Sequence, residues 1–479
     1  PQPAPATDLM TRRVGDFAGR APVTAPSTTT IRAAAQRMSE ERVSALMIVD
    51  DGRLTGIVTD RDLRSRCLAA GLSPEEPVRR IMSAGVASIG PESAAFEALM
   101  TMTRQGIHHL PVVDGQGVRG LVSATDLMRW QSASAVHLAG RVRNCESVAA
   151  LVEASSELVD LQLRLHAGGA TAGQVGQAIS SIDDAIGGRL IELAQRELGP
   201  APVPFAWAAC GSQGRHEQSA HSDQDNALIL HDDYRPEAHG DWFAALAQRV
   251  NDGLDACGFR YCPGKVMAAN ADWRQPVSAW TETFAEWIRH TDEMAAMLAA
   301  NFLDLRVIHG DPALLAPLHA TVVAECARHD GFVARMVGNA LKNRPPLGFF
   351  RNFLVAGGGE HADTFDIKRG GLIPITDIAR IHALIAGRAE IGTVARLRAV
   401  AGSPTLSAEG AAELEEAFEF LGGLRLRHQA GRIRHGLAPD NHVAPDALTA
   451  LERAQLKAVF AVVARQQETL ALRYRHRLE

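Results

Sequence analysis

Short apolar runs separated by turns rich in Asp and Gly fill the first third of the chain, and one such pattern occurs twice. Residues 43–63 read VSALMIVDDGRLTGIVTDRDL and residues 107–127 read IHHLPVVDGQGVRGLVSATDL, with Leu110 following Leu46 by 64 positions. Each copy predicts a strand, a tight turn, a second strand and a helix start. A helix with apolar residues at helical spacing precedes each copy (Ile31, Ala35, Met38; Ala95, Leu99, Met102). Since neither copy can bury a core alone, we expect the two to pack together.

The pattern changes twice after the repeat. Residues 135–200 have helical, amphipathic spacing, which predicts a helical connector and a coiled contact between two copies of the chain. Residues 203–210, 225–230 and 259–268 read as strands, and residues 285–479 as helices interrupted by a Gly-rich loop at 356–371. The predicted fold class is therefore multidomain, with α/β parts followed by an all-helical part.

Composition narrows the class of protein. At 479 residues the chain is too long for one core, and 46% hydrophobic with 22% charged residues is typical of soluble globular proteins. The net charge of -6 and an aromatic content of 5% argue against nucleic acid as a partner. No apolar run is long enough to cross a bilayer, and no signal-peptide pattern opens the chain. Six cysteines without zinc-ligand spacing are typical of reduced thiols, so we expect a cytoplasmic protein without a membrane partner. Because the sequence begins at Pro1, we expect it to be trimmed or a fragment.

The segment 211–230, GSQGRHEQSAHSDQDNALIL, carries the candidate chemistry. Gly211 ends a predicted strand and lets the backbone approach a triphosphate, while Ser212 and Arg215 supply hydrogen-bond donors. Asp223 and Asp225 stand two positions apart at the start of a strand, so both carboxylates lie on one face. Paired carboxylates beside a phosphate cradle are a typical Mg²⁺ site, and the metal would activate an attacking hydroxyl. The alternative is a solvated acidic turn.

The repeat resembles the cystathionine-β-synthase (CBS) domain, which occurs as a tandem pair, over about residues 18–133. The resemblance lies in the GIVTDRDL and GLVSATDL segments. It implies adenine nucleotide binding by Thr59 with Asp62 and by Ser123 with Asp126. A hydroxyl at a helix N-terminus favours a phosphate, and a carboxylate one turn later can accept both ribose hydroxyls. The same residues are also capping-box variants that need no ligand.

The order Gly-Ser, helix, Asp-x-Asp resembles the nucleotidyltransferase superfamily of DNA polymerase β. Its GSxGRxE…SDxD form is similar to the uridylyltransferases that modify the PII signalling protein, and closer still to an uncharacterised nucleotidyltransferase-like family that follows CBS pairs. The resemblance implies transfer of UMP or AMP from a nucleoside triphosphate to a hydroxyl on a small signalling protein such as PII. It also implies Mg²⁺ or Mn²⁺ at Asp223 and Asp225, and control by adenine nucleotides at the CBS pair.

One departure from that superfamily concerns its third carboxylate, which lies on a later strand of the sheet. The candidate strand 259–268, FRYCPGKVMA, contains none, and Asp272 and Asp304 fit poorly. The alternative function is therefore a catalytically inactive nucleotide-binding sensor.

The C-terminal part contains two further resemblances to the uridylyltransferases. These are LDLRVIHGD at 303–311 and FDIKRGGLIP at 365–374. Lys368 and Arg369 beside a Gly pair are candidates for contacting a nucleotide phosphate. Alternatively, Asp366 pairs with Lys368 and the Gly pair serves only a turn.

We accordingly expect five parts and a homodimer. The parts are an N-terminal segment (1–17), a CBS pair (18–75 and 76–134), a helical connector (135–200), a nucleotidyltransferase-like domain (201–325) and a helical C-terminal domain (326–479).

Overall fold

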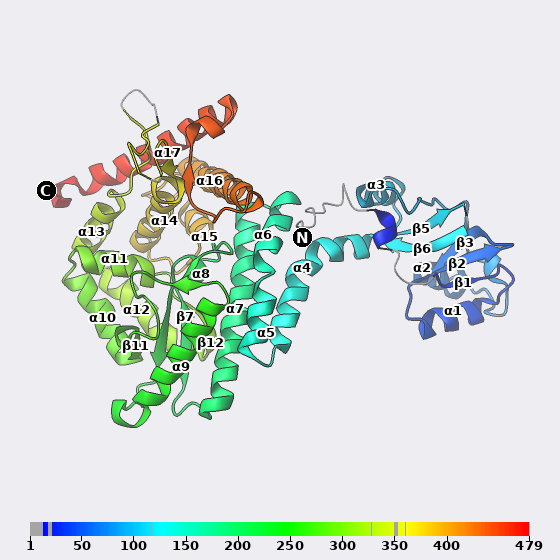
Figure 1. The fold of residues 1–479 in the computed structure, drawn as a ribbon, viewed down its shortest axis with the longest axis horizontal. Coiled ribbons are helices and arrows are strands. Elements are labelled where there is room, and N and C mark those ends of the chain that lie inside the picture. The colour runs from blue at the N-terminus through cyan, green and yellow to red at the C-terminus, as the bar shows by residue number, and fades with distance from the viewer. Residues whose placement is uncertain are drawn as a thin grey trace. The chain divides into compact units, whose positions relative to one another are not determined.

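Figure 1 shows the chain as a computed structural model that describes residues 13–17, 22–115, 117–326, 328–348, 353–359 and 361–478. The chain divides into two compact units, Pro1–Ser134 and Ala135–Glu479. Each unit is described by itself.

The first unit contains the predicted repeat as two matching strand pairs. β2 (Ala45–Asp50) pairs antiparallel with β3 (Arg53–Thr59), and β5 (His109–Asp114) pairs antiparallel with β6 (Gly117–Ser123). Their registers match position for position, and each pair has an irregularity at the equivalent step, after Ile48 and after Val112. The spacing of 64 residues therefore holds at the level of individual strand partners.

Each copy has its own apolar core, and short elements complete it. In the first copy these are β1 (Thr24–Ala25), α1 (Ile31–Glu40), α2 (Asp60–Asp62), η2 (Leu63–Leu68), η3 (Val78–Arg80) and β4 (Ser83–Ala84). In the second they are η1 (Val14–Asp16), α3 (Ala95–Gln105) and the start of α4 (Ala124–Asn144). The buried side chain of Val14 packs in the core of the second copy. The copies also touch through Ser44 Oγ and His109 Nε2, 3.1 Å apart, so the expected packing of the two is confirmed.

A four-stranded sheet lies at the centre of the second unit, in the order β11-β9-β7-β12. β7 (Phe205–Ala209) and β9 (Asn226–Leu230) are antiparallel and buried along their whole length. They are flanked by β11 (Arg274–Pro276) and β12 (Arg306–Gly310). A shorter parallel pair joins β8 (Asp223–Gln224) to β10 (Arg260–Tyr261). The predicted strand 259–268 is thus wrong beyond Tyr261, because Pro263 and Gly264 end the ladder.

Helices cover both faces of this sheet (Figure 1). Trp207 and Leu228 point to one face, where they pack with α5 (Val148–Ser155), α6 (Leu158–Ala167), α7 (Ala172–Leu198) and α9 (Pro236–Ala256). Ala208 and Ile229 point to the other face, toward α10 (Val277–Arg289) and α11 (Glu293–Phe302). The segment predicted as a connector therefore supplies one layer of this unit, which a helical pattern alone does not reveal.

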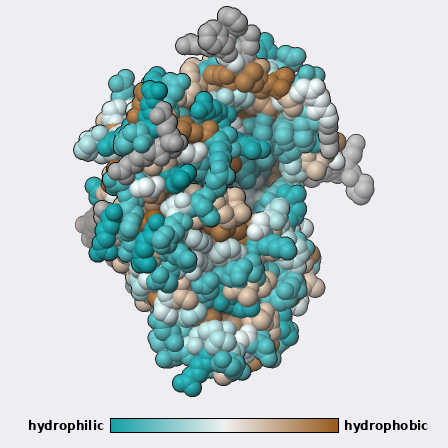
Figure 2. All heavy atoms as spheres, turned by 90° about the vertical axis from the view of Figure 1, so that its left-hand side faces the viewer, coloured by the Kyte–Doolittle hydropathy of each residue, from teal (hydrophilic) through white to brown (hydrophobic). Residues whose placement is uncertain are grey.

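The C-terminal helices share a core with the second face of the sheet. They are α12 (Ala316–Cys326), α13 (Asp330–Ala340), α14 (Ile373–Ile385), α15 (Thr393–Val400), α16 (Ala408–Arg434) and α17 (Ala450–Leu478). The irregular turn η6 (Lys368–Leu372) leads into α14, and β13 (Phe365–Asp366) pairs with β14 (His442–Val443). The face in Figure 2 is largely hydrophilic, with hydrophobic side chains in small patches. No helix in the described part of the chain has the length and apolar content to cross a membrane.

Candidate functional site

The Gly-Ser turn follows β7 directly and forms α8 (Gly211–Gly214). Gly211 has a φ of 58°, and a Cβ there would lie 2.8 Å from Asn301 Oδ1 and 2.9 Å from Asp225 Oδ2. Only glycine fits such a position without displacing its neighbours. Because β7 and β9 are antiparallel, the end of one strand adjoins the start of the other, and Cys210 N donates to Asp225 O at 3.0 Å. The turn and Asp225 are therefore brought together.

The two aspartates differ in their surroundings. Asp225 is partly buried, and burial raises the pKa of its carboxyl group, with a contribution from the charge of Asp223. The side chain of Asp223 is 37% exposed and pairs with the exposed Arg260, Nη2 to Oδ1, at 3.2 Å. Asp225 therefore faces the interior of the site, and Asp223 its opening.

Cys262 lies beside Asp225 at a position where a neighbouring strand could present a further ligand. β10 runs parallel to β8 with Arg260 opposite Asp223 and Tyr261 opposite Gln224, so Cys262 comes next to Asp225. Burial and the charge of Asp225 raise the pKa of Cys262 to about 12, and its thiol donates a hydrogen bond to the Asp225 carboxylate. A protonated thiol takes the place of an anionic third ligand.

The chemistry of this donor set fits Mg²⁺ shared with a substrate. Within the described residues, no three His, Cys, Asp or Glu side chains form a group able to hold a metal by themselves. Mg²⁺ commonly uses one or two carboxylates and takes its other oxygens from substrate phosphates and water. Asp223 and Asp225 meet that requirement, whereas a metal cage built from protein ligands alone would need more.

The charge of Lys368 acts on the aspartates from a segment more than 140 residues further along the chain. Burial lowers the pKa of its ammonium group, as do Arg425 and Arg215, whereas the charges of Asp223 and Asp225 raise it. Arg369 is exposed and donates from Nε to Asn343 Oδ1 at 3.2 Å. Asp366 accepts from Arg369 N at 2.9 Å. Of these two cations, Lys368, and not Arg369, is therefore the one whose charge acts on the carboxylates.

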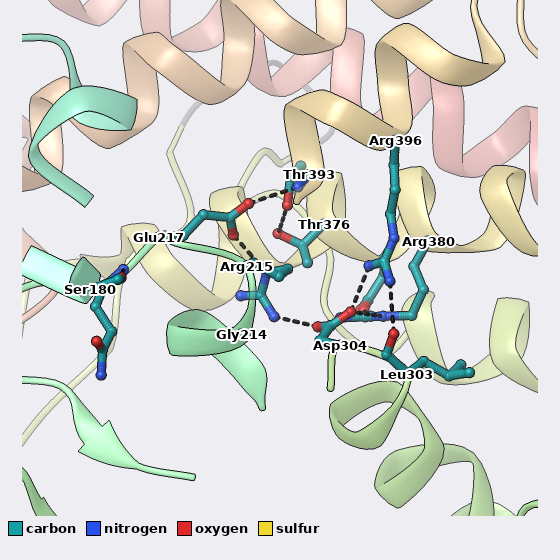
Figure 3. A network of polar contacts seen from close by, with 12 residues as sticks. Ser180, Gly214, Arg215, Glu217, Leu303, Asp304, Thr376, Arg380, Thr393 and Arg396 are labelled. Carbon is teal, nitrogen blue, oxygen red and sulfur yellow. Dashed lines mark hydrogen bonds and ion pairs between the residues drawn. The ribbon is translucent and has the colours of Figure 1, made fainter. Parts of the chain in front are cut away.

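Arg215 lies in a buried polar network (Figure 3). Its Nε donates to Glu217 Oε2 at 2.6 Å and its Nη1 to Asp304 Oδ2 at 2.5 Å. Glu217 Oε1 also accepts from Thr393 N, at the start of α15, at 2.8 Å. Because two carboxylates neutralise this guanidinium, the geometry does not match the predicted contact of Arg215 with a phosphate.

Asp304 is the centre of that network and is fully buried. Besides Arg215 it accepts from Arg380 Nη2 and Arg396 Nη1, each at 2.6 Å. Burial alone would raise the pKa of Asp304, but the three guanidinium groups hold it well below its usual range. An aspartate that fits poorly as a metal ligand instead joins the sheet to α14 and α15. An acid flanked by the apolar residues Leu303 and Leu305 was the available signal of such a role.

A second set of polar contacts, centred on Arg306, holds α8 against α7. Arg306 donates from Nη1 and Nη2 to the two carboxylate oxygens of Asp184 at 2.7 and 2.9 Å. The same guanidinium donates to the carbonyl oxygens of Gln213 and Gly214, at 3.0 and 3.1 Å. A Cβ on Gly214 would overlap the carbonyl oxygen of Asp304. The Gly-Ser turn is therefore fixed from both sides.

In the first unit, the candidate nucleotide-binding residues of the first copy form a complete capping box. Thr59 Oγ1 donates to Asp62 Oδ2 at 2.8 Å, and Thr59 N donates to the same oxygen at 3.0 Å. Ser123 ends β6 at the equivalent position. The side chain of Asp126 lies outside the part that the structure describes.

Three family models match the chain. The CBS domain model matches residues 7–69 and 78–133. The model described as "Putative nucleotidyltransferase DUF294" matches residues 156–294, and "Putative nucleotidyltransferase substrate binding domain" matches residues 330–474. The chain belongs to the CBS-domain proteins that carry a DUF294 region. The resemblances to the CBS pair and to a nucleotidyltransferase-like family that follows CBS pairs are thereby confirmed, as is the multidomain fold class.

Similarity to three individual proteins, each with CBS domains, covers between 20% and 24% of the chain. The chain is 39% identical over 102 residues to the CBS domain-containing protein CBSCBSPB1 of Arabidopsis thaliana, covering 21% of this chain and 19% of that protein. It is 36% identical over 98 residues to YhcV of Bacillus subtilis, covering 20% and 70%. The solved structure titled "CBS domain protein PAE2072 from Pyrobaculum aerophilum complexed with AMP" shares 28% identity, with coverage of 24% and 90% and a TM-score of 0.23. The chain thus spans about a fifth of the plant relative's length.

Proposed function

We propose that the second unit transfers a nucleotidyl group, UMP or AMP, from a nucleoside triphosphate to a hydroxyl, and that adenine nucleotides at the CBS pair regulate the transfer. The observation that carries the proposal is that the turn at Gly211 and Ser212 adjoins Asp225 where β7 and β9 meet, and that the charges of Asp223 and Lys368 act on Asp225. These residues combine a close backbone approach, two carboxylates and a cation. A triphosphate with a divalent metal requires those three features.

Each of these residues has a role that follows from its chemistry. The turn at Gly211 and Ser212 would let backbone and hydroxyl donors reach phosphate oxygens. Asp223 and Asp225 would hold Mg²⁺ or Mn²⁺, which supplies neutralisation of phosphate charge and activation of the acceptor hydroxyl. The ammonium group of Lys368 would neutralise a further phosphate oxygen.

The transfer itself forms one bond and breaks one. The acceptor hydroxyl oxygen bonds to the α-phosphorus, the bond from that phosphorus to the oxygen bridging to the β-phosphorus breaks, and pyrophosphate leaves. The hydroxyl proton is released to solvent. We take the acceptor to be a tyrosine hydroxyl on a small signalling protein such as PII, by resemblance to the uridylyltransferases.

At the CBS pair, Thr59 with Asp62 and Ser123 with Asp126 are the proposed contacts for phosphate and ribose. The Thr59 hydroxyl donates a hydrogen bond to the Asp62 carboxylate at 2.8 Å. A bound nucleotide would compete for this hydrogen bond. Breaking it would cost about 1 kcal/mol or less of binding free energy, because one hydrogen bond is exchanged for another. The capping geometry is therefore compatible with ligand binding.

The test is label transfer from each α-labelled nucleoside triphosphate, with Mg²⁺ or Mn²⁺, into cell extract, with and without added AMP or ATP. The double variant Asp223→Asn, Asp225→Asn should lose transfer, while Asp241→Asn, an exposed change on α9, should retain it. Transfer of equal extent by the double variant would refute the proposal.

A second candidate, the nucleotide-binding sensor without catalysis, is favoured by the position of Cys262. A neutral thiol in place of a third carboxylate reduces the negative charge available to metals. Nucleotide binding without transfer to any acceptor would favour this candidate.

A further inference from the structure

A guanidinium group from the C-terminal helices contacts the motif segment that leads to the aspartates. Arg425 lies on α16, and its Nη2 donates to Ser219 Oγ at 3.3 Å. Its Nε donates to Asn441 Oδ1 at 2.7 Å. Ser219 stands four residues before Asp223. Two neutral oxygens therefore hold this cation at the edge of the candidate site.

Arg425 lacks the carboxylate partners that the other partly or fully buried arginines of this region possess. Arg215, Arg306 and Arg380 each form an ion pair with an aspartate. Among the residues that the structure describes, no carboxylate forms an ion pair with Arg425, and its Nη1 has no hydrogen-bond partner. Burial lowers the pKa of Arg425 to about 10, offset in part by the charge of Asp366. A partly buried cation without a counter-ion is unfavourable, so this position favours an anion.

Lys368 extends the same positive region. Arg425 is close enough to lower the pKa of the Lys368 ammonium group, and Lys368 in turn experiences the charges of Asp223 and Asp225. Lys368 therefore experiences both the two carboxylates and Arg425, whereas the carboxylate that acts on Arg425 is Asp366. An acidic peptide would be repelled by those carboxylates, whereas a polyphosphate with a divalent metal matches both signs of charge.

We propose that Arg425 binds the phosphates of the nucleotide together with Lys368, so that the C-terminal domain holds the nucleotide itself. This inference rests on the proposed function and names a residue that neither the motif nor the resemblance indicates. The guanidinium fork suits phosphate oxygens, because Nη1 is available and the long bond from Nη2 to Ser219 is readily exchanged.

The experiment compares Arg425→Gln with Arg427→Gln in the full chain. Arg427 lies on the same helix, is 52% exposed and pairs with Glu452, so it is a matched control. Affinities are measured by calorimetry for each of the four nucleoside triphosphates with Mg²⁺, for inorganic tripolyphosphate and for the four nucleosides. Nucleotide binding at the CBS pair is common to both variants and cancels in the comparison.

The expected result is selective for phosphate. Arg425→Gln should weaken triphosphate and tripolyphosphate binding about 10-fold or more, the loss expected for a charge-assisted hydrogen bond. Nucleoside affinity should stay unchanged, and Arg427→Gln should behave as the wild type. If Arg425→Gln is not folded by circular dichroism, Arg425→Lys replaces it, with an expected loss of about 3-fold because the charge remains and the fork is lost.

Three outcomes would overturn the inference, and they differ in what else they overturn. Unchanged triphosphate affinity in the folded variant refutes the role of Arg425 and leaves the proposed function standing. Equal losses for nucleosides and triphosphates indicate a structural role and have the same consequence. A wild-type chain that binds no triphosphate and no tripolyphosphate refutes the inference and the proposed function together.

Discussion

Replacement of Asp304 by Asn tests whether one buried charge holds the sheet and the C-terminal helices together. The side chain is 0% exposed, and Asn keeps its volume while removing its charge. In the intact network three carboxylates face three guanidinium groups (Glu217, Asp304, Asp377; Arg215, Arg380, Arg396). The variant leaves two carboxylates facing three guanidinium groups. Breaking a buried ion pair from one side costs about 3–5 kcal/mol, out of about 5–15 kcal/mol for a typical domain.

The dependence on pH gives this prediction a second readout. The guanidinium groups hold the pKa of Asp304 below its unfolded value of about 3.9. A carboxyl group whose pKa is lower in the folded state stabilises the fold above the unfolded pKa and loses that effect as pH falls through the folded pKa. The difference in unfolding free energy between wild type and Asp304→Asn should therefore be largest at pH 7 and shrink below about pH 4.

Urea unfolding followed by tryptophan fluorescence measures this difference. Five of the six tryptophans lie in the second unit, so the signal reports mainly on its unfolding (Trp207, Trp242, Trp273, Trp280, Trp287). The control, Asp241→Asn, is exposed and should change stability by no more than about 0.5 kcal/mol. A loss below about 1 kcal/mol at pH 7, or a difference that does not shrink at all between pH 7 and pH 3, would show that ionised Asp304 does not hold the domains together.

Three further predictions concern single side chains. Burial raises the pKa of Asp183 to about 8, above its unfolded value, so the folded state retains a proton and wild-type stability should fall as pH rises from about 4 to 8. Asp183→Asn mimics the protonated form, so its free energy of unfolding should rise by up to about 4 kcal/mol relative to that of the wild type between pH 5 and pH 8. Urea unfolding at both pH values measures this change. An equal dependence of the unfolding free energy on pH in the two proteins would contradict the prediction. Gly214→Ala should lower stability by about 2 kcal/mol or more in thermal unfolding, because its Cβ overlaps Asp304 O, and a wild-type melting temperature would be inconsistent with the fixed turn. Thr59→Ala should cost the first unit about 1 kcal/mol through loss of the cap to Asp62, and, where AMP binds, should also reduce the stabilisation by added AMP; stabilisation equal to wild type would remove Thr59 from the binding site.

The local patterns of the chain were predictable because they report on local geometry. The repeat could be aligned residue by residue, since alternation and turn residues determine strand register. The runs that became β7 and β9 are apolar at nearly every position, as expected for strands covered on both faces. The shared strand face predicted for Asp223 and Asp225 from a period of two is a weaker case, since Asp225 lies between β8 and β9 and in neither strand.

The long-range partners were not predictable in the same way. Arg215 reads as a phosphate ligand from its motif, and only tertiary packing brings Asp304, 89 residues later, against its guanidinium. The amphipathic pattern of 135–200 predicts helices but does not say which surface they cover. Arg425 gave no signal either, because an arginine in an amphipathic helix is usually a solvated residue.

The neutralisation of Arg215 determines where the positive charge of the site must come from. A triphosphate needs cations that balance its negative charge. The carboxylates of Asp223 and Asp225 cancel part of the positive charge of a bound metal, so further cations are required. Arg215 supplies little of this positive charge, because the charges of Glu217 and Asp304 neutralise its guanidinium. Arg260 pairs with Asp223 at the opening of the site. Lys368, whose pKa responds to both aspartates, and Arg425, whose charge acts on Lys368, belong to the C-terminal half of the unit. Because the Asp304 network joins the two halves, we expect its rupture to weaken nucleotide binding even where each half remains folded.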